Sequence, residues 1–242
     1  MGALMRAIVS GHTQGLGAAI AAQLLARSIP VLGLARGHCP ALAAAYPDLL
    51  TEIGCDLADT SALEAWLAVG GLDGFIDGAD TLLLVNNAGM LDPVGPLQAQ
   101  DPLAVARAVA LNVSAPLMLA AALAGRAPQL RILHISSGAG RNAYPGWSVY
   151  GATKAALDHH ARAVALDAAP GVRICSLAPG VIDTAMQAQI RAMPPARFPP
   201  RERFVALHRD GQLSSPEQAA ALVLAYLLSA SFGSKPVDDL RA

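Results

Sequence analysis

The chain has 242 residues, 54% of them hydrophobic, which is enough to bury one large core. Its formal net charge is -1, so no overall field favours nucleic acid or a membrane surface as a partner. The three cysteines lack the spacing of a disulfide framework or a zinc site, which indicates reduced residues in a cytoplasmic protein.

Two further features bear on where the protein works. The start, Met1 to Arg6, runs directly into a strand-like stretch, which predicts no signal peptide. The longest uninterrupted apolar run, Ala219 to Leu228, is shorter than the about 20 residues that cross a bilayer. We therefore expect a cytoplasmic protein without a membrane partner.

Apolar, β-rich runs alternate with Ala/Leu-rich stretches along almost the whole chain. The predicted strands are Leu4–Ser10, Pro30–Ala35, Leu49–Gly54, Thr81–Val85, Leu130–Ser136, Val172–Leu177 and Lys235–Asp239. The predicted helices are Leu16–Ser28, Ala41–Tyr46, Ser61–Leu67, Pro102–Ala124, Ser148–Ala168 and Pro216–Ser229. Apolar strands separated by helices are typical of a parallel sheet covered on both faces. No linker or repeat divides residues 1–242, so we expect a single doubly wound α/β domain with a seven-stranded, mainly parallel sheet.

The first turn joins a strand to a helix and is rich in glycine. Glycine permits a tight turn and close approach to a phosphate, and a helix N-terminus attracts negative charge. The spacing is Gly-x-x-x-Gly-x-Gly, and an ordinary strand–helix turn is the alternative reading. The strand before and the helix after favour a cofactor-binding turn made of Gly11, His12, Thr13, Gln14, Gly15, Leu16 and Gly17.

The ends of the next two strands carry charged residues. An acidic residue after the second strand would bind the ribose of NAD, whereas an arginine can hold the 2′-phosphate of NADP. Arg36 stands there and the acid is absent, so NADP(H) is favoured over NAD(H), although Arg36 could be a plain surface residue. After the third strand, Asp56, next to Leu57, could bind the adenine amino group or cap a helix.

Small and amide residues follow the fourth strand, in Asn87, Ala88 and Gly89. A loop of such residues at the carboxyl end of a strand can lie against a cofactor without steric conflict. In isolation this stretch is better read as a turn.

Tyr150 and Lys154 stand four residues apart, which places them one above the other on a helix face. A cation beside a phenol favours the phenolate, so we expect Lys154 to lower the Tyr150 pKa from about 10 towards neutrality. That is the property of a proton donor that works near pH 7. Only two of the 17 basic residues are lysines, so the pairing is unlikely to arise by chance.

These motifs, in this order over roughly Ala3 to Met186, resemble the short-chain dehydrogenase/reductase family, nearest to its sepiapterin and benzil reductase-like members. The resemblance implies a Rossmann domain that transfers a hydride between a nicotinamide cofactor and a carbonyl or alcohol substrate. Ser10 departs from the family's usual threonine, and Gln14 stands where NADP users often carry a second base. The chain ending resembles the shorter ending of the reductases named above.

The resemblance also implies roles for individual residues. Tyr150 matches the proton donor and Lys154 its partner, which also holds the nicotinamide ribose. Ser137 matches the substrate-orienting serine, with Ser136 as the less well-placed alternative. Asn112 matches the helix asparagine that keeps a water near the lysine, and an exposed asparagine is its alternative. The loop that meets the nicotinamide carboxamide is matched by Pro179, Gly180, Ile182 and Thr184.

Residues 185–213 break the alternation of strands and helices and read as a substrate lid. Tyr144, Trp147 and Met186 flank the expected pocket and suit a flat or aromatic carbonyl compound, with core packing the equal alternative for Trp147. Five arginines could attract an anionic substrate or keep the lid soluble, and solubility is favoured. They are Arg191, Arg197, Arg201, Arg203 and Arg209.

Three functions fit these motifs. The first is an NADPH-dependent reductase of ketones or aldehydes. The second is a 3-oxoacyl thioester reductase, and the third a non-catalytic NADP-binding sensor, against which the complete Asn112, Ser137, Tyr150 and Lys154 set argues.

Adjacent His159 and His160 point in different directions on a helix, so no metal site is expected. Helices 102–124 and 148–168 are rich in Ala and Leu, and members of the resembled family pair through them, so we expect a homo-oligomer, dimer or tetramer. Packing on the sheet is the equal alternative for their small side chains.

Overall fold

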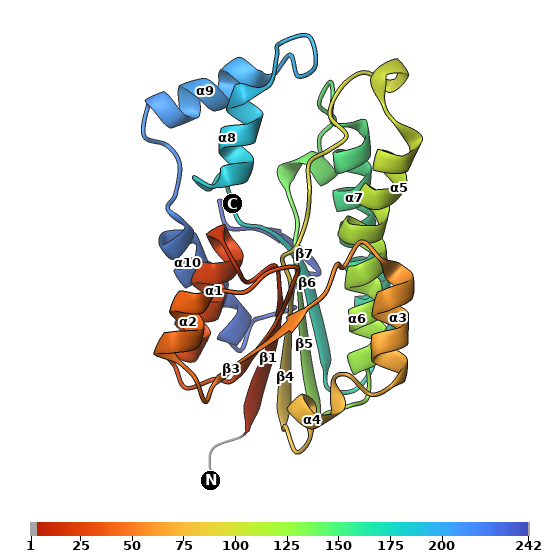
Figure 1. Ribbon diagram of the computed structural model, residues 1–242, viewed down its shortest axis with the longest axis vertical. Coiled ribbons are helices and arrows are strands. Elements are labelled where there is room, and N and C mark those ends of the chain that lie inside the picture. Colours follow the sequence, from red (N-terminus) through yellow and green to blue (C-terminus); the bar gives the residue numbers. More distant parts are fainter. Residues whose placement is uncertain (1–3, 242) are drawn as a thin grey trace.

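A computed structural model of the protein describes residues 4–241 as three layers, a central sheet with helices on both sides (Figure 1). All seven strands are parallel, in the order β3-β2-β1-β4-β5-β6-β7. The strands are β1 (Met5–Ser10), β2 (Val31–Ala35), β3 (Leu50–Gly54), β4 (Thr81–Asn86), β5 (Gln129–Ile135), β6 (Val172–Ala178) and β7 (Val237–Asp239). The predicted fold is confirmed, with the sheet parallel throughout.

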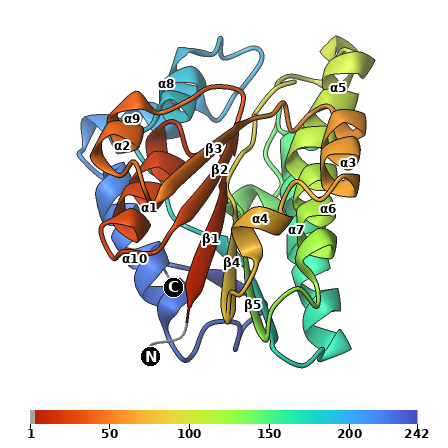
Figure 2. The ribbon, with the colours of Figure 1, turned by 60° about the horizontal axis from the view of Figure 1, so that its bottom comes forward.

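Two groups of helices cover the sheet, one on each face (Figures 1 and 2). One group is α1 (Gly15–Leu25), α2 (Pro40–Ala45) and α10 (Pro216–Leu228). The other is α3 (Thr60–Ala68), α5 (Pro102–Val109), α6 (Ala115–Leu123) and α7 (Ser148–Asp167). Each group closes its own core, with Ile20, Leu24 and Val223 buried on one side and Leu63 and Leu119 on the other.

The strand order reverses between β1 and β4, because the chain first builds outward to β3 and then returns to the other side of β1. In doubly wound sheets a crevice opens at this switch point, beyond the carboxyl ends of the strands. Helices α8 (Ala185–Ala192) and α9 (Arg201–Arg209) lie above these carboxyl ends (Figure 1). The sequence predicted a lid over 185–213 but not its two helices, because prolines interrupt the helical pattern there.

Two other elements depart from the predicted ones. The expected helix 102–124 contains a π-helical turn, Ala110–Ser114, which separates α5 from α6. The short helix α4 (Asp73–Ile76) was not predicted. Single 3-10 turns lie at Leu97–Ala99 and Gly138–Gly140. All predicted strands agree with the structure within two residues at each end, because they are bounded by turns and the central ones are largely apolar.

One helical segment, Pro102–Leu123, is long and apolar enough to cross a membrane by length and composition. It is not an uninterrupted apolar run, because Arg107, Asn112 and Ser114 lie within it. In this structure α5 packs against α7, and α6 packs on β4 and β5. Helices that cover the core of a soluble protein pass the same length and composition test.

Candidate active site

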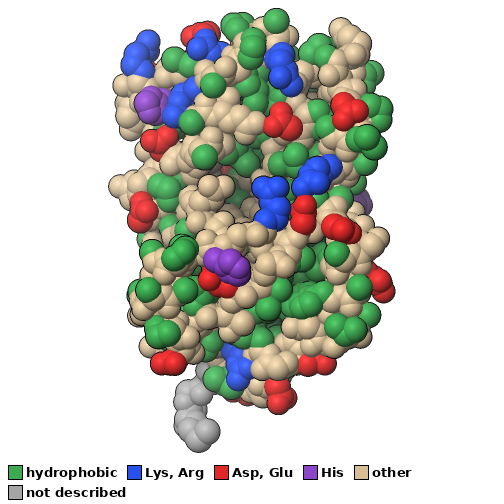
Figure 3. Space-filling view, in the orientation of Figure 1, with side chains coloured by type: hydrophobic (Ala, Val, Ile, Leu, Met, Phe, Trp, Pro, Cys, Tyr) green, Lys and Arg blue, Asp and Glu red, His purple; other side chains and the backbone are tan. Residues whose placement is uncertain are grey.

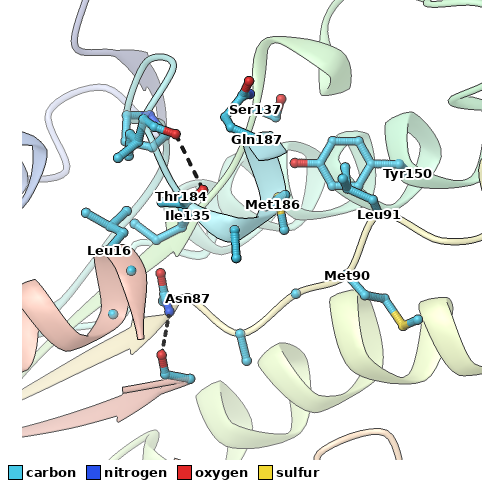
Figure 4. Close-up of a pocket in the computed structure, with 18 of the residues that line it drawn as sticks. Leu16, Asn87, Met90, Leu91, Ile135, Ser137, Tyr150, Thr184, Met186 and Gln187 are labelled. Atoms are coloured by element: carbon cyan, nitrogen blue, oxygen red, sulfur yellow. Dashed lines mark hydrogen bonds between the residues drawn. The ribbon is translucent and has the colours of Figure 1, made fainter. Parts of the chain in front are cut away.

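A cavity of about 620 Å³ runs along the carboxyl edge of the sheet at the switch point. Its two ends differ: Leu16 and Asn87 lie at one end, and Ser137, Gln187 and Tyr150 lie at the other (Figure 4). We refer to these as the cofactor end and the substrate end. The cavity therefore connects the glycine-rich turn with the Tyr150 side chain.

The turn between β1 and α1 has backbone that only glycine adopts easily. Gly11 and Gly15 have φ of +70° and +55°. A Cβ atom on Gly17 would lie 2.1 Å from the Gly11 carbonyl oxygen. Gln14, the N-cap of α1, makes no side-chain cap hydrogen bond. The turn thus presents bare backbone and a helix N-terminus to the cavity, which fits the pyrophosphate of a dinucleotide.

Side-chain hydrogen bonds join this turn to the loop after β4. The Asn87 side-chain amide donates to the carbonyl oxygens of Ser10 and Gly11, at 3.1 Å each. The Ser10 hydroxyl accepts from the backbone amides of Asn87 and Ala88, at 3.0 Å each. Ser10, which departs from the family's usual threonine, therefore supplies a hydroxyl that holds the two loops together.

Tyr150 lies in the first turn of α7 and is 7% exposed. Burial raises the pKa of its phenol above 10, and a hydrogen bond with the Ser137 side chain offsets this in part. The sequence predicted a lowered pKa from Lys154, and that expectation is not met. Burial is the largest influence on this pKa, and the Lys154 Nζ atom lies 5.7 Å from the centre of the Tyr150 ring.

Lys154 is buried, and its ammonium donates to the Ile135 carbonyl oxygen at 2.8 Å. Burial lowers the pKa of Lys154 to about 8, and the negative charge of Asp158 acts in the opposite direction. Asp158 is 1% exposed and accepts hydrogen bonds from Ser136 and Ser176, at 2.7 Å each, and from Arg141 at 3.1 Å. The carboxylate one helical turn after the lysine is thus fully engaged.

Asn112 lies in the π-helical turn and is buried. Its side chain accepts from the Met90 amide and donates to the Met90 carbonyl, at 2.9 Å each, and it donates to the Thr153 hydroxyl at 3.1 Å. A Cβ atom on Gly89 would lie 3.4 Å from the Asn112 oxygen and 3.6 Å from the Lys154 ammonium. Asn112 therefore lies behind the lysine, and it is not among the residues that line the cavity. Such π-helical turns often occur at functional sites.

The comparisons with known proteins agree with this geometry. The family model for short chain dehydrogenase matches residues 5–195. A benzil reductase ((S)-benzoin forming) of Bacillus cereus is 34% identical, over 89% of this chain and 91% of its own length. A sepiapterin reductase of Meriones unguiculatus is 31% identical, over 94% and 92%.

Solved structures give the same result. A short-chain dehydrogenase/reductase from Burkholderia vietnamiensis is 52% identical with a TM-score of 0.73, and the alignment covers 100% of this chain and 99% of that one. The KRED1-Pglu enzyme is 27% identical with a TM-score of 0.83, over 97% and 99%.

The chain belongs to the short-chain dehydrogenase family. It is therefore an oxidoreductase that uses a nicotinamide nucleotide and acts on small-molecule carbonyl or alcohol substrates. The resemblance to benzil and sepiapterin reductases holds over most of the chain.

Most of the predicted site residues of this dehydrogenase line the one cavity. They are Gly11, Thr13, Gln14, Gly15, Leu16, Gly17, Arg36, Asp56, Leu57, Asn87, Ala88, Gly89, Ser137, Tyr150, Lys154, Pro179, Gly180, Ile182 and Thr184. In the loop after β6, Ile182 forms a parallel bridge with Ser214, and the Thr184 hydroxyl donates to the Ile182 carbonyl at 3.4 Å.

His12 is the exception at the cofactor end of this dehydrogenase. Its ring is 0% exposed and lies over Gly33, where an added Cβ would be 2.5 Å from it. Its Nε2 atom lies 2.6 Å from Glu52. The side chain is therefore directed under β2 and β3, away from the cavity. The sequence placed His12 among the cofactor contacts because of its position in the turn, which does not reveal the direction of a side chain.

Five polar residues line the cavity that motif reading did not place there, namely Arg107, Asn142, Gln187, Arg203 and Arg241. Arg107 comes from α5 and pairs with Asp56 at 2.7 Å. Arg241 arrives from the chain end after β7. No local sequence motif identifies these residues as cavity residues, because the fold brings them together from distant segments. Within residues 4–241, no group of three His, Cys, Asp or Glu side chains could hold a metal ion.

Proposed function

We propose that this protein is an NADPH-dependent carbonyl reductase that converts a ketone or aldehyde to an alcohol, with Tyr150 as the proton donor. One observation carries the proposal. The buried Tyr150 phenol, the Ser137 hydroxyl and the Lys154 ammonium line one end of a cavity whose other end is the glycine-rich turn. The similarity to benzil and sepiapterin reductases supports a ketone as substrate.

The residues at the substrate end can perform the proton chemistry of this reaction. Hydride delivery to the carbonyl carbon is the chemistry that a bound nicotinamide supplies. Tyr150, with its raised pKa, keeps its proton at neutral pH and can donate it to the carbonyl oxygen. The Ser137 hydroxyl donates to the same oxygen as negative charge develops there. Lys154, charged below about pH 8, stabilises the phenolate that remains.

Asn112 has a supporting role in this proposal. Its hydrogen bonds to Met90 and Thr153 fix the loop after β4 next to the residue preceding Lys154. Thr153 in turn donates to the Tyr150 carbonyl at 2.8 Å. The asparagine thus holds the helix turn that carries both Tyr150 and Lys154, and it supports the proton path from Lys154 to solvent.

The test of the reaction uses benzil and an acetoacetyl thioester as alternative substrates, with NADPH and NADH in parallel. We expect turnover of benzil with NADPH. Tyr150→Phe should lower kcat by about 10²–10⁴-fold, the usual contribution of a general acid, and leave NADPH binding by fluorescence titration unchanged. Near-normal turnover in Tyr150→Phe would disprove the role of Tyr150. Preference for the thioester would favour a 3-oxoacyl reductase, and NADPH binding without any turnover would favour a sensor.

The preference for NADPH rests on the charges at the end of β2. Arg36 follows β2, lines the cavity and has no carboxylate within ion-pair distance among residues 4–241. Arg107 lines the same end and is a second base there, although Asp56 partly neutralises it. A free guanidinium suits the 2′-phosphate of NADP.

Arg36→Gln tests the cofactor preference. We expect the ratio of kcat/KM for NADPH to that for NADH to fall at least about tenfold, because a charge-assisted hydrogen bond is lost. Arg27→Gln is the matched control, since Arg27 is exposed and its side chain, within residues 4–241, bonds only the Gln23 carbonyl at 2.6 Å. An unchanged ratio in Arg36→Gln would remove the basis of the NADPH assignment.

We also propose that the protein is a homo-oligomer that pairs through α5 and α7. These helices pack side by side and carry apolar side chains into solvent, with Leu103 79% and Leu166 85% exposed. Covering such residues in a second copy would remove apolar surface from water. Light scattering should give a dimer or tetramer, and Leu103→Lys should weaken it. A monomer at micromolar concentration would contradict the proposal.

A further inference from the structure

The five arginines of the lid differ in what they contact. Four of them are engaged by a carboxylate or a backbone carbonyl of the protein. Arg191 pairs with Asp183 at 3.4 Å, Arg197 donates to the Val94 carbonyl at 2.9 Å, Arg201 donates to the Arg191 carbonyl at 2.7 Å, and Arg209 pairs with Asp210 at 2.8 Å. These four thus shape or solubilise the lid, as the sequence favoured for all five.

Arg203 is the exception. The residue is exposed and lines the cavity, and its guanidinium donates one hydrogen bond, to the Tyr144 hydroxyl at 3.3 Å. Within residues 4–241 it has no carboxylate at ion-pair distance. The neighbouring cation on this wall, Arg241, is held by Asp239 through two hydrogen bonds of 2.9 and 2.7 Å. Arg203 is therefore the lid cation whose charge is left for something in the cavity.

The charge of the cavity wall supports this. Among the described residues that line it, Asp56 is the one acid, and it lies at the cofactor end beside Arg107. Lining cations at the substrate end are Lys154, Arg203 and Arg241. On the face shown in Figure 3, most Lys and Arg side chains gather over the upper half and at mid-height. A cleft lined by one sign of charge attracts the opposite charge, although the chain as a whole carries -1.

Aromatic rings connect Arg203 to the reacting end. Tyr150 meets Trp147 with ring centres 5.3 Å apart, and Trp147 meets Tyr144 at 5.5 Å. Tyr144 then accepts the hydrogen bond from Arg203, which leaves its own hydroxyl proton free to be donated. Two ring contacts and one hydrogen bond therefore connect Tyr150, the proton donor, to the guanidinium of Arg203.

We propose that the substrate carries a carboxylate, bound by Arg203 and the Tyr144 hydroxyl, on an aromatic body that places its carbonyl at Tyr150. The inference rests on the carbonyl reductase function proposed above. A planar guanidinium matches a carboxylate, and the aromatic residues Tyr144, Trp147 and Tyr150 that line the cavity match an aromatic body. The five-arginine pattern of the lid thus contains one substrate-binding residue among four structural ones.

Matched aldehydes test this inference at two lengths. They are 4-formylbenzoate and 4′-formylbiphenyl-4-carboxylate, each compared with its neutral carboxamide under saturating NADPH. We expect wild-type kcat/KM to favour the carboxylate at least about tenfold at one length, mainly through KM, as a charge-assisted hydrogen bond would give. Arg203→Gln should bring this ratio close to one. Arg209→Gln, which alters an arginine of the same helix outside the cavity, should leave it unchanged.

The outcomes separate the two proposals. Reduction of the carboxamides without preference for either carboxylate would overturn the anion site and keep the reductase. Absence of turnover with all four aldehydes and with benzil would overturn the reductase, and the anion site with it. An Arg203→Gln variant that raises KM for NADPH and leaves the carboxylate ratio intact would assign Arg203 to the cofactor and overturn the inference.

Discussion

The two ends of the cavity are built from different parts of the chain. The turn at the cofactor end is formed mainly by backbone groups: glycines at positive φ, a helix N-terminus and a loop that Asn87 and Ser10 hydrogen-bond to the turn. The substrate end is side chain: Trp147, Phe198 and Phe204 pack together, and Trp147 and Phe198 stack at 4.4 Å. Two buried polar atoms there, Trp147 Nε1 and Gln187 Oε1, have no hydrogen-bond partner among residues 4–241.

This difference indicates how each end recognises its ligand. A backbone site admits very few residue types, because an added Cβ would collide with the backbone itself. A side-chain site can change its ligand by replacing one residue at a time, without disturbing the sheet below. The glycine-rich turn of the cofactor end should therefore respond to small changes with loss of binding, and the substrate end with altered selectivity.

The largest expected effect comes from Gly17→Ala at the cofactor end. The new Cβ would lie 2.1 Å from the Gly11 carbonyl oxygen and 2.4 Å from the Asn87 amide nitrogen, so the turn must shift. Because the displaced turn no longer fits the pyrophosphate, we expect a loss of about 10²-fold in NADPH affinity, equivalent to about 2.8 kcal/mol. Fluorescence titration with NADPH measures it.

Gly54→Ala is the control for this substitution. Gly54 ends β3, and an added Cβ there would meet nothing within 4 Å. We expect wild-type NADPH affinity in this variant. If Gly17→Ala bound NADPH normally, the cofactor end would not depend on bare backbone, and the contrast with the substrate end would fail.

The same difference explains what sequence reading could predict. Gly11, Gly17 and Asn87 could be identified from the sequence because backbone constraints require particular residue types at particular spacings. The central strands were located because both of their faces are buried, which makes them largely apolar. The sequence therefore predicted the turn residues of the cofactor end as well as it predicted the strands of the core.

Side-chain direction and long-range encounters were not predictable in the same way. The position of His12 in the turn suggested a cofactor contact, yet its ring lies under Gly33. Arg241 reaches the cavity only because β7 returns beside β6. The raised Tyr150 pKa depends on burial, which two residues at helical spacing cannot reveal.

A second, intermediate effect concerns pH, at the boundary between the two ends. Lys154 has its pKa lowered to about 8, so it loses its charge as pH rises through 8. We expect kcat/KM for NADPH to be level below this pH and to fall to about one tenth at pH 9, as for one essential protonated group. Asp158 raises the Lys154 pKa, so Asp158→Asn should move the decline to lower pH.

Arg141→Gln separates this charge effect from loss of structure. It removes the 3.1 Å ion pair with Asp158 and leaves the carboxylate in place. Its decline should therefore not move to lower pH. A decline at the same pH in wild type and Asp158→Asn would show that the buried carboxylate does not set the charge of Lys154.

The smallest expected effect comes from Phe198→Leu at the substrate end. Phe198 is 0% exposed and belongs to the aromatic cluster of the lid, whereas Phe232 is equally buried in the core on the α10 face of the sheet. Replacing either ring by leucine should cost about 1 kcal/mol, because the volume changes little. The Tm for thermal unfolding should therefore fall by a similar amount, about 2–4 °C, in both variants.

Only Phe198→Leu should also raise KM for the carbonyl substrate, by a few-fold, with KM for NADPH unchanged, since Trp147 loses its stacking partner. If Phe232→Leu raised the substrate KM as much, the change in KM would reflect the overall loss of stability, and the aromatic cluster of Trp147, Phe198 and Phe204 would have no separate role in substrate binding.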